Sequence, residues 1–245
     1  MRKKRINLLT VPLDIIADDQ LEDRIGAMIA DGKQHQIVLL SLWDFMRARS
    51  RSELGLSMRA SSMILTSSRL VARGARFLRN EEVNRFMPFD FVIRLLGILE
   101  KRGRSVYLIG GKPGYLHTAA SNLRGSFPGL QIVGRCAGYF PESHEENILL
   151  AIKKASPSLL LASKGVPGRE RWLVEHKKSF VPGLTMWCDD CLEVFSGAKK
   201  KISRKLWTKG FDFLPALLRK PWRLGRGFVY FGYFILLAFY KIRHL

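Results

Sequence analysis

A strand, a glycine-rich turn, a helix and a second strand follow one another in residues 105–140, and this order constrains the fold most. Residues 106–109 form an apolar run that breaks into Gly110-Gly111-Lys112-Pro113-Gly114. A helical segment covers residues 116–126, and a second strand with an apolar pair at residues 132–133 covers residues 131–133. The pattern predicts a βαβ unit, in which a helix joins two parallel strands.

A second glycine turn follows another apolar run. Residues 159–162 are apolar and are followed by Lys164-Gly165-Val166-Pro167. Glycine lets backbone N–H groups approach an anion closely, and the start of a following helix favours negative charge. Because an open α/β sheet binds its ligand at the carboxyl ends of the strands, we expect both turns to contact one anionic ligand.

The rest of the chain alternates between strand and helix patterns. Strands are expected over residues 6–11, 37–42, 62–65 and 184–187, and helices over residues 18–30, 43–60, 89–101, 143–155 and 170–178. This alternation predicts a three-layer, Rossmann-like α/β domain with a mostly parallel sheet. The composition changes near residue 197, so the expected division is an α/β domain over residues 1–197 and a basic, aromatic, helical appendage over residues 198–245.

The charge is strongly positive, at +20 for 245 residues. It implies an anionic partner such as nucleic acid, acidic lipid or a phosphorylated substrate. Residues 199–226 hold ten basic side chains and one acid, and an uncharged aromatic stretch follows over residues 228–240. This combination predicts helices that lie on an anionic membrane surface. The residues expected there are Trp207, Trp222, Arg223, Arg226, Phe228, Tyr230, Phe231 and Phe234.

Two other interpretations of the C-terminal region stay open. Residues 228–240 are too few for the roughly twenty that span a bilayer, and they could form a buried C-terminal helix instead. The aromatic side chains could also stack on the bases of a nucleic acid. They cluster in one apolar run, however, which a water-exposed base-stacking surface avoids, so no nucleic acid partner is expected.

Neither a metal site nor a redox site is expected. The three cysteines, Cys136, Cys188 and Cys191, are an odd, small number without a signal-peptide pattern, which suggests a reducing cytoplasm. Cys188 and Cys191 have CxxC spacing, but no second pair of ligands accompanies them. The chain has no Asp-x-Asp motif, and its five histidines are scattered. We therefore expect no metal ion and no other cofactor.

The glycine turns belong to a wider set of motifs. These are Gly110-Gly-Lys-Pro-Gly114, Pro128-Gly-Leu130, Gly134, Gly138-Tyr-Phe140 and Gly165-x-Pro167-x-x-Glu170-x-Trp172. Together they resemble the WecG/TagA/CpsF family of bacterial glycosyltransferases, most closely over residues 107–172. The resemblance implies metal-independent transfer of a hexose from a UDP-sugar to a polyprenyl-diphosphate-linked saccharide in surface or exopolysaccharide synthesis. It also implies a peripheral or monotopic enzyme at the cytoplasmic face of the bacterial inner membrane.

The resemblance assigns a nucleotide-sugar site. Its members are Gly110, Gly111, Lys112, Gly114, Gly138, Tyr139, Gly165, Pro167, Glu170 and Arg85. Simpler roles stay open for three of them. Lys112 could be an exposed turn lysine, and Glu170 could cap a helix. Arg85 could be a surface arginine that pairs with Glu81 or Glu82.

The positions that supply the catalytic base and bind the acceptor in the family differ here. The family's Thr-x-Asn falls at Leu40 and Leu42, and its Asp-Gly falls at Thr66-Ser67. Leucine cannot hydrogen-bond a sugar, and threonine is a poor general base. Asp44 follows the second strand closely and is the candidate replacement base, although a helix-start acid is the simpler interpretation.

Three classes of function therefore remain. The first is the glycosyltransferase described above. The second is a binding or scaffold subunit of a polysaccharide assembly complex, with a bound nucleotide sugar and no turnover, either as a homo-oligomer or with other assembly proteins. The third is a basic protein that binds nucleic acid.

Overall fold

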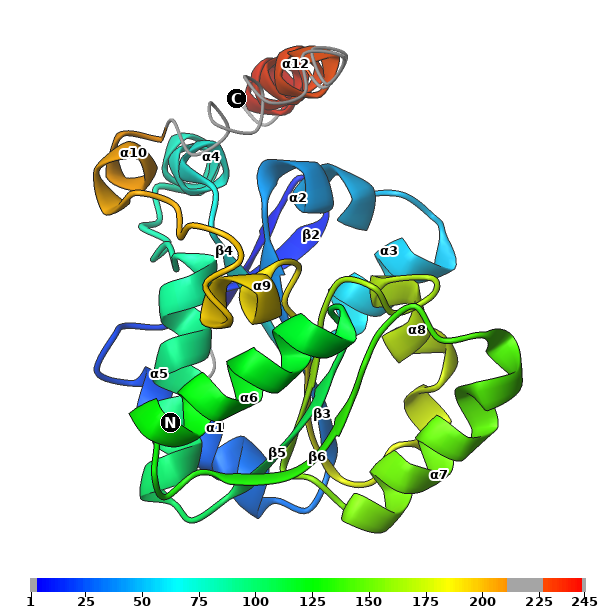
Figure 1. The fold of residues 1–245 in the computed structure, drawn as a ribbon. Coiled ribbons are helices and arrows are strands. Elements are labelled where there is room, and N and C mark those ends of the chain that lie inside the picture. The colour runs from blue at the N-terminus through cyan, green and yellow to red at the C-terminus, as the bar shows by residue number, and fades with distance from the viewer. Residues whose placement is uncertain (1–3, 211–226, 244–245) are drawn as a thin grey trace. The chain divides into compact units, whose positions relative to one another are not determined.

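Residues 4–210 and 227–243 are described by the computed structural model of the chain (Figure 1). Trp222, Arg223 and Arg226, which the sequence predicts at a membrane surface, lie outside the described residues.

A six-stranded sheet carries the fold, with the strand order β4-β3-β8-β7-β5-β6. The pairs β3–β8, β8–β7, β7–β5 and β5–β6 are all parallel. The strands are β3 Gln34–Leu40, β4 Met63–Thr66, β5 Ser105–Ile109, β6 Gln131–Cys136, β7 Leu159–Ala162 and β8 Gly183–Trp187. The predicted α/β class with a mostly parallel sheet is thus confirmed.

Helices connect the strands and follow the last one (Figure 1). They are α1 Leu21–Ala30, α2 Leu42–Ala48, α3 Glu53–Ala60, α4 Arg69–Arg79, α5 Pro88–Lys101, α6 Pro113–Ser126, α7 Glu145–Ala155, α8 Glu170–Glu175, α9 Cys191–Phe195, α10 Arg204–Lys209 and α12 Gly227–Arg243. Two short 3₁₀ helices, η1 Glu142–His144 and η2 Lys177–Ser179, precede α7 and follow α8.

The connections create a reversal of strand order between β5 and β7. From β5 the chain crosses through α6 to β6, whereas from β7 it crosses through α8 to β8, in the opposite direction along the sheet. Parallel crossovers are right-handed, so α6 and α8 must cover opposite faces. In open α/β sheets a ligand binds outside the carboxyl ends of two such strands. The turns after β5 and β7 occupy this place.

Packing on one face of the sheet agrees with this topology. Tyr107 and Ile109 from β5 and Leu160 from β7 form one buried cluster with Ile148 of α7 and Trp172 of α8. The path from β6 to β7 runs in the same direction as the path from β7 to β8, so α7 and α8 share a face. Alternation along each strand sends the intervening side chains to the other face.

The N-terminal strand differs from the prediction. Residues 6–11 were expected to form one strand, but β1 Arg5–Leu8 and β2 Val11–Asp14 form an antiparallel hairpin. Leu9 and Thr10 make the turn with φ values of +45° and +75°. A two-residue hairpin turn with positive φ at both positions usually has Asn or Gly, so the sequence carries no turn signal here.

Two helical regions also differ from the prediction. The expected helix over residues 43–60 is interrupted, because the Ser52 side chain accepts a hydrogen bond from the N–H of Gly55 and starts α3 anew. The helix α4 was not predicted at all. Its Ser68 N-cap accepts from the N–H of Val71, and Asn80 ends it in the left-handed conformation with φ of +52°.

The chain divides into two compact units. For the described residues, the first unit lies within residues 1–18, 39–87 and 202–245, and the second unit within residues 19–38 and 88–201. The second unit contains the turns after β5, β6, β7 and β8. The predicted functional division at residue 197 is a different kind of boundary and stays a prediction.

The C-terminal helix α12 packs within the first unit through one face. Tyr233 is fully buried and its hydroxyl donates to the carbonyl of Leu70 in α4 at 3.0 Å, while its ring meets Phe45 of α2 edge-on at 5.9 Å. Phe228, Phe231 and Phe234 are exposed instead. Among the described residues, no helix is both long enough and apolar enough to cross a membrane.

Candidate functional site

The glycine turns of the second unit are joined to one another through their backbones. The N–H of Gly111 donates to the carbonyl of Lys164 at 2.6 Å, which connects the turns after β5 and β7. The N–H of Gly138, after β6, donates to the carbonyl of Gly111 at 2.9 Å. The N–H of Tyr139 donates to the carbonyl of Gly165 at 2.5 Å. The sequence prediction that these turns lie together is therefore correct.

Glycine is needed where the turns meet. Gly110 has φ of +124°, and a Cβ atom there would lie 2.6 Å from the carbonyl oxygen of Ser163. A Cβ atom at Gly138 would lie 2.7 Å from the backbone of Gly165. Larger residues at either position would push the turns apart. These glycines therefore let the turns after β5, β6 and β7 pack into one unit, which we call the platform. Their own N–H groups donate to carbonyl groups of the protein.

The start of α6 supplies the donors that remain for an anion. Pro113 is the first helical residue and Lys112 is the N-cap, without a side-chain capping bond. The next N–H groups, those of Gly114 and Tyr115, belong to the first turn and have no partner within the helix. Both residues are exposed. The helix has 14 residues, so its dipole adds a favourable field for a phosphate at this end.

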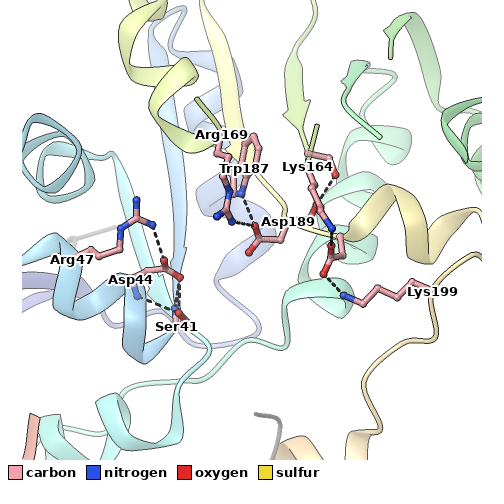
Figure 2. A network of polar contacts seen from close by, with 10 residues as sticks. Ser41, Asp44, Arg47, Lys164, Arg169, Trp187, Asp189 and Lys199 are labelled. Carbon is pink, nitrogen blue, oxygen red and sulfur yellow. Dashed lines mark hydrogen bonds and ion pairs between the residues drawn. The ribbon is translucent and has the colours of Figure 1, made fainter. Parts of the chain in front are cut away.

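Two aspartates after β8 hold cationic side chains near the platform (Figure 2). Asp189 accepts from Arg169 at 3.1 Å and from the indole of Trp187 at 3.0 Å. Asp190 forms ion pairs with Lys164, at 3.8 Å, and with Lys199. Lys164 also donates its N–H to the carbonyl of Asp189 at 2.9 Å, so the turn after β7 is bound to the turn after β8.

Glu193 is the most unusual carboxyl group in this region. Its Oε2 atom is buried without a hydrogen-bond partner among the described residues. Burial raises the pKa of Glu193 above its ordinary value, and the negative charge of Asp190 acts in the same direction. A backbone hydrogen bond at Glu193 and the positive charges of Lys164 and Lys199 act against this rise. Next to it, the Leu192 side chain lies 3.7 Å from where a Cβ of Gly111 would be, so α9 contacts the platform.

An open pocket of about 480 Å³ lies beside the turn after β6. Tyr107 and Phe140 give it aromatic walls, and Arg135, His144 and Asn147 give it polar ones. It also includes Gly138, which joins it to the platform. Such a pocket suits a planar group with polar edges.

The cysteines behave as packing residues. Cys188 and Cys191 are buried free thiols. Burial raises the pKa of Cys188 well above its usual value, and the hydrogen bond with Cys191 adds to this rise. A thiol with a raised pKa is a poor metal ligand and a poor nucleophile. Among the described residues, no cluster of histidine, cysteine and acidic side chains could hold a metal ion.

The positions that correspond to the family's catalytic base and acceptor site lie in the first unit. Thr66 is fully buried: its hydroxyl donates to the carbonyl of Leu40 at 3.0 Å and accepts from the N–H of Ser68 at 3.1 Å. The guanidinium of Arg85 donates to the carbonyl of Ser67 at 3.3 Å and lies 4.2 Å over the ring of Trp207. Arg85 therefore lies beside the position of the family's base.

Asp44 lies in the first turn of α2 and takes part in its N-terminal cap. Its carboxylate accepts from the Ser41 hydroxyl at 2.6 Å and from the Ser41 N–H at 3.3 Å, which completes a capping box (Figure 2). Arg47 lies 3.5 Å from the same carboxylate. The simpler role that the sequence left open, that of a helix-start acid, is thus present in the structure. A catalytic role of Asp44 stays a prediction.

The remaining motif residues lie at the start of α8. Glu170 is the first residue of this helix, and Pro167 is exposed in the turn before it. Trp172 is buried, donates to Glu145 and contacts the rings of Phe140 and Phe180. Trp172 therefore packs against the core.

Comparison with known proteins decides the family. The family model described as "Glycosyl transferase WecG/TagA/CpsF family" matches residues 6–244. The chain belongs to this family. It is also 23% identical over 220 residues to the N-acetylglucosaminyldiphosphoundecaprenol N-acetyl-beta-D-mannosaminyltransferase of Bacillus subtilis (strain 168), covering 89% of this chain and 81% of that protein. The match agrees with the resemblance read from the glycine motifs.

Sequence reasoning missed the acidic and basic network after β8 and the buried carboxyl of Glu193. A signal was present, because the WecG/TagA/CpsF pattern Gly-Gly-x-Phe-Asp falls at residues 189–193. The sequence places Asp189 and Asp190 at the glycines of that pattern, but it does not show what these aspartates contact. Only the fold shows that both aspartates face cations from other segments.

Proposed function

We propose that this member of the WecG/TagA/CpsF family transfers a hexose from a UDP-sugar to a polyprenyl-diphosphate-linked saccharide. The product would serve a surface or exopolysaccharide pathway. By its name, the relative from Bacillus subtilis is an N-acetylmannosaminyltransferase that acts on N-acetylglucosaminyldiphosphoundecaprenol, a lipid-diphosphate-linked acceptor. A UDP-sugar donor with N-acetylmannosamine is the first candidate for this chain.

One observation carries the proposal: the exposed first turn of α6 beside the joined glycine turns. Gly114 and Tyr115 are exposed, and their N–H groups belong to the turn that follows β5, where the strand order reverses. A leaving diphosphate could bind these donors, with Lys112 and Lys164 as nearby cations. Such donors stabilise the negative charge that develops on the leaving diphosphate. Together with the two lysines they would take the place of a metal ion in this reaction.

The proposal is tested by a transfer assay. Purified protein is mixed with a panel of UDP-sugars and with polyprenyl-diphosphate-linked N-acetylglucosamine, and the lipid products are identified by mass spectrometry. We expect a product that is heavier by one hexose-type residue with at least one donor. Calorimetry with UDP alone runs in parallel, and no measurable UDP binding would overturn the proposal.

A catalytically impaired binding or scaffold subunit is the second candidate, and Thr66 favours it. Its hydroxyl donates one hydrogen bond and accepts one within the protein, and the side chain is fully buried. It cannot accept a proton from a sugar hydroxyl in this state. UDP binding without transfer from any donor would support this candidate over the enzyme.

We further propose that the protein acts at the cytoplasmic face of the bacterial inner membrane, as a peripheral or monotopic protein. The lipid-linked acceptor and the basic C-terminal region support this placement. Removal of residues 228–245 would be an ambiguous test, because Tyr233 and Leu237 are buried in the first unit. Substitution of exposed side chains is the sharper test.

A further inference from the structure

The helix α12 lies along α4 in a defined orientation. Tyr233 donates to the carbonyl of Leu70, and Lys241 donates to the carbonyl of Phe77 at 3.4 Å. Residues 233–241 of α12 thus run beside residues 70–77 of α4, in the same direction. Between these two contacts, Leu237 is buried and lies near Gly74. The two helices therefore form one paired surface of the first unit.

The side of α12 that faces away from α4 is apolar and exposed. Its members are Phe228 (81% exposed), Phe231 (66%), Ile235 (52%), Phe239 (54%) and Ile242 (75%). At 3.6 residues per turn these five positions fall within roughly 80° of one another, and Tyr233 and Leu237 lie on the opposite side. Scattered exposed apolar side chains are normal, but a continuous stripe of this kind marks a binding surface.

A row of arginines occupies a neighbouring side of α4. Arg69, Arg73 and Arg76 are spaced by four and three residues, so they point to one side of the helix. Arg69 donates to the carbonyl of Lys209 at 2.6 Å, and Arg76 lies 3.4 Å from Glu82 in an exposed ion pair. Arg73 is exposed and makes no hydrogen bond or ion pair with another described residue. Two of the three guanidinium groups are thus accessible to an outside anion.

We propose that α4 and α12 together bind an anionic phospholipid bilayer, with the α12 stripe among the acyl chains and the α4 arginines on the lipid phosphates. This inference rests on the proposed function for its membrane acceptor and adds α4 to the membrane-binding surface. An interfacial helix sinks roughly 5–10 Å below the headgroups, and packed helices lie roughly 8–10 Å apart. When α12 lies among the acyl chains, α4 therefore lies closer to the aqueous phase, at the depth of the lipid phosphates. The planar guanidinium of arginine binds phosphate well.

A second copy of the chain is a less suitable occupant. A symmetric dimer through the α12 stripe would bring the same surface of both copies together. The two arginine rows would lie behind α12 on the outer sides of such a dimer, so this contact would offer them no opposite charge. A bilayer with anionic lipid supplies the opposite charge instead.

The test uses the full-length protein and sedimentation with vesicles. One vesicle contains phosphatidylcholine alone, and the other also contains phosphatidylglycerol, which is anionic. The variant Arg73→Gln/Arg76→Gln removes two α4 charges, and Lys153→Gln/Lys154→Gln removes two exposed charges at the end of α7 as the matched control. A third variant, Phe231→Ser/Phe239→Ser, alters only the stripe.

We expect the α4 variant to lose about tenfold or more of its affinity for anionic vesicles, because each cation near the surface contributes on this scale. The control should change by less than about twofold, and the stripe variant should bind both vesicles less well. Equal losses in the α4 variant and its control would overturn the role of α4. A stripe variant that binds vesicles normally but no longer dimerises in sedimentation equilibrium would assign the face to a second copy.

These outcomes are separate from those of the transfer assay. Calorimetry with UDP should give the same affinity for all three variants and the wild type, since none of the changes lies in the second unit's glycine turns. Normal UDP binding without vesicle binding would remove the membrane surface and leave the nucleotide site intact.

Discussion

At the scale of single residues, Gly114 gives the sharpest test of the anion site. A side chain there meets open space, whereas valine at Gly111, with φ of +66°, would strain its turn. Gly114→Asp places a negative charge in the first turn of α6, which stabilises the helix but repels a phosphate. We expect UDP affinity to fall at least about tenfold while the melting temperature stays the same or rises, as measured by calorimetry and thermal unfolding.

Gly125 supplies the matched control on the same helix. It also has open space beside it, and it lies eleven residues further along α6, at roughly 17 Å. This is beyond the screening length of about 10 Å at 0.1 M salt. Gly125→Asp should therefore leave UDP affinity unchanged. Equal losses at both positions would point to a general charge effect and would contradict the site at the start of α6.

Asp44 can be tested for catalysis separately from its capping role. Asn can still accept from the Ser41 N–H, so Asp44→Asn should keep most of the capping and change stability little. If Asp44 is the base, the transfer rate should fall at least about tenfold with UDP affinity intact, since general bases contribute roughly 10²–10⁴-fold. Ser41→Ala should instead lower the unfolding free energy by about 1 kcal/mol while the Asp44 carboxylate stays in place. Unchanged turnover in Asp44→Asn would eliminate this base.

Glu193 predicts a pH-dependent stability. Its folded-state pKa lies above the ordinary value of 4.5, so the folded protein holds this proton more tightly than the unfolded chain. The contribution to stability is therefore full at pH values below the ordinary pKa and is lost as the pH rises through the raised pKa. Gln cannot ionise, so Glu193→Gln should melt like the wild type at low pH and at higher temperature than the wild type near neutral pH. A constant difference across the pH range would contradict this.

At the scale of elements, the contact between α4 and α12 depends on one glycine. A Cβ atom at Gly74 would lie 2.0 Å from the hydroxyl oxygen of Tyr233 and 3.2 Å from Leu237. Gly74→Ala should therefore displace α12 and lower the unfolding free energy by about 1–3 kcal/mol, as overpacking does. Denaturant unfolding measures this loss, and proteolysis should cut the chain more rapidly near α12.

The control for this change is Gly97 in α5. A Cβ atom there meets only Phe127, at 3.8 Å, which is an ordinary contact. Gly97→Ala should raise the unfolding free energy by up to about 1 kcal/mol, because alanine favours the helix. A stabilising effect at both glycines would show that α12 does not depend on the close approach at Gly74.

The elements that the sequence predicted well are those with strong apolar patterns. Strands β5 and β7 and helix α5 agree with the predicted ranges to within a residue. The helix α4 was missed because its four arginines and Gly74 interrupt any apolar run, although its arginines share a side. Its N-cap, Ser68, was a usable signal that lies shortly after the predicted strand over residues 62–65.

In the candidate site, too, the sequence predicted the elements but not the contacts between them. The glycine turns were predictable, because strand ends and glycines are visible in the sequence. The hydrogen-bond partners of their N–H groups were not predictable, because Gly111 and Gly138 donate to carbonyl groups of other turns. The N–H groups proposed to bind the anion are therefore those at the start of α6 and not those of the glycine turns. This assignment needs the backbone hydrogen bonds of the structure.

At the scale of the whole molecule, the charge of +20 predicts a strong dependence on salt. The screening length falls from about 8 Å at 0.15 M to about 3 Å at 1 M salt, so attraction to an anionic membrane should weaken greatly. The apolar stripe of α12 does not depend on charge in this way. Vesicle sedimentation over a salt series should therefore show a steep loss for vesicles with phosphatidylglycerol and a nearly flat, weaker association for phosphatidylcholine alone.

Two variants separate the charge from the stripe in that series. Arg73→Gln/Arg76→Gln should converge with the wild type at high salt, because the charges that it lacks are then screened. Phe231→Ser/Phe239→Ser should stay below the wild type at every salt concentration, since its loss is apolar. If both variants converged with the wild type, membrane association would be purely electrostatic, and the exposed stripe of α12 would need another explanation.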